Sequence, residues 1–107
     1  MAWLMRGGEV LASAELATTR SQRRRGLIGR DELPGVFVLR ARSVHTIGVR
    51  FPIDVAFCDE AGRVIRIVTM RPNRVCAPVL RSHTAIEAPA GTFGEWRLRV
   101  GDVLEVR

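Results

Sequence analysis

Turn-forming residues recur through this chain at short intervals, so its regular elements must be short. The 107 residues include 10 glycines and 5 prolines, and pairs such as Gly7-Gly8 and Pro34-Gly35 separate the apolar stretches. Glycine adopts the positive φ angles that tight turns need, and proline interrupts helices and central strands. Turn signals about every ten residues predict a mainly β domain, a small sandwich or barrel with one or two short helices.

Seven stretches have the apolar, β-branched composition of strands. The first two flank Gly7-Gly8, a link that favours a tight hairpin. Asp59-Glu60-Ala61-Gly62 offers a second hairpin connection, because acidic residues commonly open turns and glycine closes them. The predicted strands cover residues 2–5, 9–17, 36–39, 53–58, 63–70, 85–88 and 103–106.

Two segments carry helix signals. Thr18-Thr19-Arg20-Ser21 offers several N-cap oxygens for a short helix over residues 22–30, in which Gly26 and Gly29 each cost about 1 kcal/mol relative to alanine. Thr92-Phe93-Gly94-Glu95 matches a capping box, with threonine at the cap and glutamate three residues later. It predicts one or two helical turns that continue through residues 96–98.

Length and composition indicate one domain over residues 1–107. A chain of this size buries roughly two-thirds of its unfolded surface, which is enough for a core without a metal or a disulfide. No apolar run approaches the ~20 residues needed to cross a bilayer, and the first residues lack the pattern of a secretory signal. We therefore expect a cytoplasmic protein with no membrane contact.

The cysteine and histidine pattern gives no reason to expect a cofactor or metal. Cys58 and Cys76 lie 18 residues apart without a Cys-x-x-Cys pair. In a reducing compartment we expect two free thiols, and a single disulfide between them is the alternative. Together with His45 and His83 they make up one candidate set of four zinc ligands, but the spacing of these residues matches no paired-ligand pattern.

The charge pattern indicates attraction to anions. The net charge is +6, and all 17 basic residues are arginines. Such a surface attracts nucleic acid and phosphorylated metabolites alike. The densest cluster is expected to be solvated or paired with carboxylates, and nucleic-acid contact is the alternative, although no recognised nucleic-acid module accompanies it. This cluster comprises Arg20, Arg23, Arg24, Arg25 and Arg30.

Five segments, in this order and spacing, resemble the family called domain of unknown function 192. They are Arg25-Gly26-Leu27-Ile28-Gly29-Arg30, Val44-His45-Thr46, Phe51-Pro52-Ile53-Asp54-Val55-Ala56-Phe57, Ile86-Glu87-Ala88-Pro89-Ala90-Gly91 and Gly101-Asp102. The resemblance runs from about residue 11 to residue 106. It implies a compact β fold, similar to a jelly roll or small sandwich, with short helices and no assigned reaction.

One segment departs from the pattern of many relatives. These carry an aromatic residue and then Met-Lys-Asn-Thr before the Pro-x-Asp signature, whereas this chain has His45-Thr46-Ile47-Gly48-Val49 there. The chain resembles a Val-His-Thr branch, so no role for that lysine and asparagine carries over.

Asp54 is the most informative single residue. It lies in the stretch 53–58, where both faces of a strand would be apolar, so we expect its carboxylate to be buried. A buried carboxylate needs a partner, and Arg25 or Arg30 is our candidate, because arginine stays charged and pairs bidentately. Such a pair could lock two elements together, form the floor of a ligand pocket, or take part in catalysis.

Glu87 and His45 complete the candidate site. Small and apolar neighbours favour an inward-facing Glu87, and if it met Asp54 the two carboxyl groups could perform acid–base chemistry. Two separate structural carboxylates are the alternative. His45 could be a structural residue, a general base or a ligand contact.

Three functions remain open from the sequence. The first is a non-catalytic binding or accessory domain with an Arg/Asp pocket for a small polar or anionic ligand, built from Arg25, Arg30, His45, Asp54 and Glu87. The second is a small hydrolase or isomerase that uses Asp54, Glu87 and His45. The third is a basic, nucleic-acid-associated protein. The sequence does not indicate an oligomeric state.

Overall fold

The protein folds around one curled sheet of seven strands, shown by a computed structural model that describes residues 1–107. The strands are β1 (Ala2–Arg6), β2 (Glu9–Leu16), β3 (Val36–Arg40), β4 (Ile53–Cys58), β5 (Val64–Met70), β6 (Thr84–Pro89) and β7 (Leu104–Val106). The helices are α1 (Arg20–Arg25) and α2 (Thr92–Glu95). The prediction of a mainly β fold with two short helices is confirmed, in its barrel-like form.

The strands lie in the order β5-β4-β6-β3-β2-β1-β7. Neighbours are antiparallel except for β2 and β3, which run parallel. A parallel pair cannot be joined by a tight hairpin, so the chain crosses over between them, and α1 lies in that connection. The hairpins predicted at Gly7-Gly8 and at residues 59–62 both form, as β1–β2 and β4–β5.

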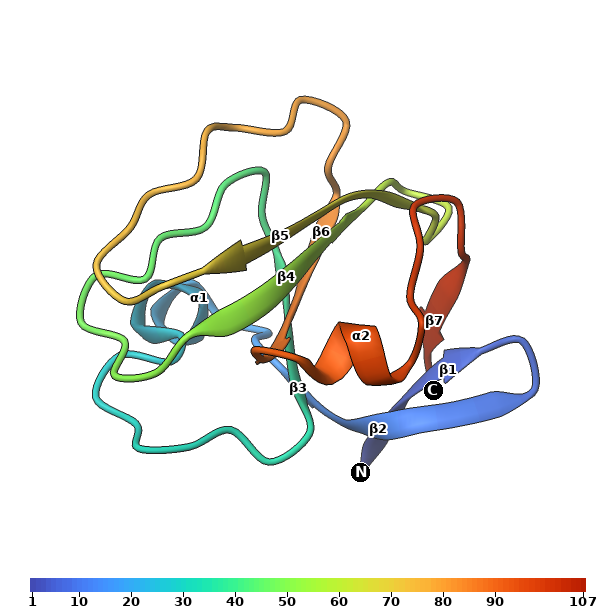
Figure 1. The fold of residues 1–107 in the computed structure, drawn as a ribbon, viewed down its shortest axis with the longest axis horizontal. Coiled ribbons are helices and arrows are strands. Elements are labelled where there is room, and N and C mark those ends of the chain that lie inside the picture. The colour runs from blue at the N-terminus through green and yellow to red at the C-terminus, as the bar shows by residue number, and fades with distance from the viewer.

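The central strands are buried on both faces, and each face has its own apolar cluster. On one face Val36, Ala56 and Ile86 pack against Phe93 and Leu98, which follow β6 in the chain. The opposite face has the second cluster, which includes Phe37, Val55, Ala85, Leu27 and Val44. Figure 1 shows α1 and α2 on either side of β3 and β6. The segments that join α1 to β3 and β3 to β4 therefore cover the face opposite to α2.

Helix α1 is shorter than predicted and begins earlier. Thr19 is its N-cap, and a capping box links the Thr19 and Gln22 side chains to backbone N–H groups of the first turn. The helix ends after Arg25 because Gly26 takes a φ of +50°. Residues 26–29 form turns instead, and the last turn of α1 consists of arginines.

Helix α2 begins differently from the sequence prediction. Its N-cap is Gly91, Thr92 lies inside the helix, and no side-chain hydrogen bond is made by the cap residue. The N–H groups of Gly91 and Phe93 instead donate to Oδ2 of Asp54 on β4, at 2.9 and 3.1 Å. The predicted capping box is therefore wrong, because a carboxylate from the sheet already occupies the position that caps this helix.

Neither helix is long and apolar enough to cross a bilayer. Both cysteines are free, with Cys58 buried in the core and Cys76 partly buried. Burial raises the pKa of the Cys58 thiol to about 12, so this thiol is chemically inert at neutral pH.

Candidate functional site

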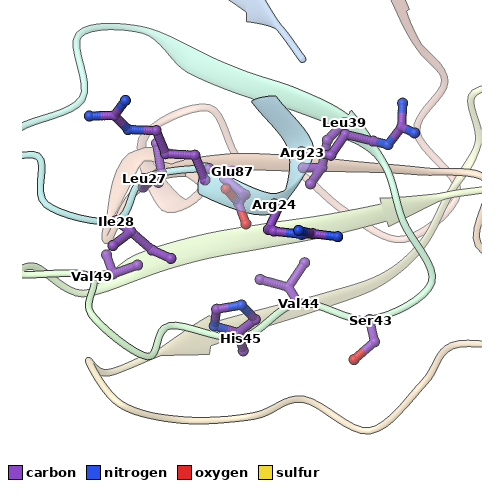
Figure 2. Close-up of a pocket in the computed structure, with 12 residues that line it drawn as sticks. Arg23, Arg24, Leu27, Ile28, Leu39, Ser43, Val44, His45, Val49 and Glu87 are labelled. Carbon is purple, nitrogen blue, oxygen red and sulfur yellow. The ribbon is translucent and has the colours of Figure 1, made fainter. Parts of the chain in front are cut away.

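A pocket of about 80 Å³ lies over the sheet face that carries Glu87, beside the end of α1. Glu87 of β6 is its acidic residue, and its walls come from the end of α1, the turn after it and the segment 43–49 (Figure 2). We call it the Glu87 pocket. It is lined by Arg23, Arg24, Arg25, Gly26, Leu27, Ile28, Leu39, Ser43, Val44, His45, Val49 and Glu87.

Glu87 is buried among apolar side chains. It is 5% exposed, and its register partners on the two neighbouring strands are Phe37 and Val55, whose side chains are on the same face. No hydrogen bond or ion pair compensates the Glu87 carboxyl group, and burial is the cause that raises its pKa from 4.5 to about 7. An acid in this position changes its charge near neutral pH.

The Glu87 oxygens reach the open space of the pocket. Every side-chain polar atom that is fully shielded in this protein has a hydrogen-bond partner. Because the Glu87 carboxyl has none, its oxygens must face the pocket. Figure 2 shows the carboxyl group among the lining residues, with the Arg24 guanidinium to one side and the His45 ring to another.

The Arg24 guanidinium lies beside the Glu87 carboxyl group, whereas the Arg23 side chain, also on the pocket wall, extends away from it (Figure 2). Neither arginine, nor Arg25, has a carboxylate partner. The five ion pairs of the protein use other arginines, namely Arg6, Arg30, Arg50 and Arg107. All three arginines lie in the last turn of α1, where cations interact favourably with the helix dipole. Their guanidinium groups are therefore available to an anion.

Hydrogen bonds hold the segment 43–49 in place as the opposite wall. Thr46 is fully buried, and its hydroxyl donates to the Arg71 carbonyl at 2.5 Å and accepts from the Arg74 N–H at 2.9 Å. Gly48, with φ of +82°, packs so closely that a Cβ would lie 3.2 Å from the Ile28 side chain. This close approach joins the wall to the turn after α1.

His45 lies at the exposed side of the pocket. Its Nδ1 accepts a hydrogen bond from the Ile47 N–H at 3.2 Å. With Nδ1 as acceptor, the neutral ring carries its proton on Nε2, which makes no hydrogen bond within the protein. His45 can therefore donate to a molecule bound in the pocket.

The predicted pairing of Asp54 with arginine is wrong. Asp54 is buried, as expected, at 4% exposure. Its carboxylate accepts hydrogen bonds from the Thr69 hydroxyl and from the N–H groups of Gly91 and Phe93. Three such bonds satisfy a buried carboxylate without a counter-charge. Asp54 thus anchors α2 to the sheet.

Arg30 and Arg25 have separate environments. Arg30 forms two parallel hydrogen bonds to Glu15 on β2, at 2.8 and 2.6 Å, and lies 5.4 Å from the Phe37 ring centre. These bonds lower the pKa of Glu15. Arg25 makes no ion pair and lines the Glu87 pocket. Neither arginine contacts Asp54.

The two predicted carboxylates do not meet. In the β4–β6 register Asp54 pairs with Ala88, and Val55 pairs with Glu87, so Asp54 and Glu87 point to opposite faces of the sheet. Asp54 borders a different, open hollow of about 320 Å³ together with Arg97. The acid–base set drawn from Asp54, Glu87 and His45 is therefore not assembled.

Three of the five predicted site residues share one pocket, namely Arg25, His45 and Glu87, whereas Arg30 and Asp54 lie elsewhere. Arg23 and Arg24 were not predicted as pocket residues, although they belong to the basic cluster. The Thr19 capping box was the available signal, because it sets where α1 begins and so which arginines share its last turn. No three histidine, cysteine or acidic side chains lie close enough to hold a metal ion.

The sequence has relatives among known proteins. The sequence profile of the DUF192 family, described as an uncharacterised ACR, matches residues 2–106. The UPF0127 proteins of Pyrococcus abyssi and Pyrococcus horikoshii are each 32% identical over 63 residues, which is 59% of this chain and 54% and 55% of theirs. The aligned part therefore spans about half the length of these relatives.

Two crystal structures share the fold. A protein of unknown function from Novosphingobium aromaticivorans has a TM-score of 0.81 and 17% identity, covering 97% of this chain and 82% of that one. A proposed transcription regulator from Sinorhizobium meliloti has a TM-score of 0.79 and 24% identity, covering 98% of this chain and 91% of that one. At these identities the likeness establishes the fold alone.

Proposed function

Since the chain belongs to the DUF192 family, whose description assigns no activity, we propose from its geometry that it is a non-catalytic domain that binds a small anionic or polar molecule in the Glu87 pocket. One observation carries the proposal. A buried carboxyl group without a hydrogen bond opens onto a cavity that three unpaired arginines line. Because the carboxyl oxygens reach the open space of the pocket, a bound molecule can form a hydrogen bond with them.

The charges around the pocket favour an anion. Arg23, Arg24 and Arg25 carry three positive charges, whereas Glu87 carries at most one negative charge. Guanidinium groups bind carboxylate and phosphate through paired, charge-assisted hydrogen bonds. The cavity of about 80 Å³ limits the buried part of the ligand to a small group.

Substitution of the pocket arginines tests the proposal. We expect phosphate, acetate or pyruvate to raise the melting temperature of the protein, with R24Q and R25Q binding about tenfold to a hundredfold more weakly, since each change removes a charge-assisted contact. R20Q is the matched control, because Arg20 lies on the same helix but does not line the pocket. Isothermal titration calorimetry measures the affinities.

The control variant decides between a site and general charge attraction. Equal weakening by R20Q and R24Q would mean that the anion responds to the net charge of the protein and not to the pocket. If none of these anions binds the wild-type protein, the proposal is wrong.

A nucleic-acid role is the second candidate, and one observation favours it. Arg20, Arg23, Arg24 and Arg25 all lie on α1 and none forms an ion pair. The Sinorhizobium meliloti protein described as a proposed transcription regulator has the same fold. Contacts with several phosphates make affinity fall steeply with salt, so retention on a DNA resin above about 0.2 M salt distinguishes this role from small-anion binding.

A further inference from the structure

The surroundings of Glu87 determine what its carboxyl group can bind. On its own sheet face, β3 contributes Phe37 and Leu39 and β4 contributes Val55, none of which is charged. The groups that carry charge or titrate come from two other elements: α1 supplies Arg23, Arg24 and Arg25, and the segment 43–49 supplies His45. None of them forms an ion pair or hydrogen bond with Glu87.

The pocket therefore has a basic side and an acidic side. Resting on the proposed function, we infer that the pocket binds short organic carboxylates that carry a second oxygen able to accept a hydrogen bond. The protonated carboxyl group of Glu87 donates that hydrogen bond. The ligand carboxylate pairs with the guanidinium group of Arg24, which lies beside Glu87 (Figure 2). The second oxygen reaches Glu87, where a neutral carboxyl group donates an O–H and an ionised one only repels.

Burial at Glu87 supports the protonated form. Because its pKa is about 7, roughly half of the molecules already carry the proton at neutral pH. A ligand that accepts a hydrogen bond from this proton raises the pKa further, so binding takes up about half a proton at pH 7. Above pH 7 the affinity falls, because each bound molecule must first protonate the acid.

Two probes of matched size separate the two contacts. Pyruvate has the carboxylate and an oxo oxygen, and propionate has the carboxylate without that oxygen. We expect pyruvate to bind roughly fivefold more tightly at pH 6, which corresponds to one neutral hydrogen bond. Its affinity should fall about tenfold between pH 6 and pH 8, following the protonated fraction of Glu87. Calorimetry in two buffers of different ionisation enthalpy measures the number of protons that the protein takes up on binding.

Three variants test whether Glu87 is the group that takes up the proton on binding. E87Q keeps a permanent N–H donor, so it should keep the preference for pyruvate and lose the pH dependence. E87L should bind both probes equally, through the arginines alone. H45Q should keep the pH dependence, because the inference assigns the proton to Glu87 and not to this other side chain of the pocket. Circular dichroism spectra establish that each variant is folded.

The outcomes distinguish this inference from the proposed function. Equal binding of pyruvate and propionate, affinity independent of pH, or loss of the pH dependence in H45Q would overturn the inference while small-anion binding stands. Failure of phosphate, acetate, propionate and pyruvate alike to bind would overturn both.

Discussion

Replacing Asp54 with alanine lowers the free energy of unfolding by about 3–5 kcal/mol, because three buried donors lose their acceptor at once. Two of these are the N–H groups of Gly91 and Phe93 at the start of α2, and the third is the Thr69 hydroxyl on β5. Hydrogen bonds to a charged group contribute more than neutral ones, and unpaired buried N–H groups add their desolvation cost. Urea denaturation measures the loss.

Two further variants make this result specific. D54N keeps one acceptor oxygen, so we expect a smaller loss of about 1–2 kcal/mol. D31A is the matched control, since Asp31 is 85% exposed and pairs only with Arg50 at the surface, where an ion pair contributes less than about 1 kcal/mol. A D54A protein as stable as D31A would contradict the anchoring role of Asp54.

Replacing Glu87 with glutamine removes a large pH dependence of stability. In the wild-type protein the acid is protonated in both the folded and unfolded states below pH 4.5, so burial then carries no ionisation cost. Between pH 4.5 and about 7 the unfolded chain releases its proton while the folded protein keeps it, and stability falls as pH rises. Above about pH 7 the loss is complete and amounts to about 3 kcal/mol.

The neutral glutamine avoids this loss. We therefore compare the free energy of unfolding of E87Q with that of the wild type. The difference, E87Q minus wild type, should be about 2–3 kcal/mol larger at pH 8 than at pH 5, measured by urea denaturation at both pH values. E32Q is the control, because Glu32 is exposed and forms no ion pair. An unchanged difference between E87Q and wild type at the two pH values would mean that Glu87 is not an isolated buried acid.

The strands were predictable because their signals are local. The stretch 53–58 is apolar on both faces and is bounded by Pro52 and by the turn at residues 59–62, and β4 has these bounds. The same pattern correctly predicted that Asp54 is buried. The partner of Asp54 was not predictable, because it depends on which backbone segment lies over β4, and here that segment is the start of α2, which follows 37 residues later.

The composition of the pocket depends on strand register. A shift of one residue between β4 and β6 would place Glu87 on the face of Asp54, and the sequence patterns of both strands would allow it, since each is apolar on both faces. The role of Arg25 at the pocket, and the pairing of Arg30 with Glu15, likewise follow from where α1 ends, which Gly26 sets through its positive φ.

Ligand binding and its pH dependence both require that Glu87 is an unpaired acid that faces the pocket. The most direct measurement is the pH titration of its side-chain carboxyl carbon by ¹³C NMR, with the resonance assigned by its absence in E87Q. We expect an apparent pKa near 7 that rises when pyruvate is added. A pKa near the ordinary value of 4.5 that pyruvate leaves unchanged would contradict the account.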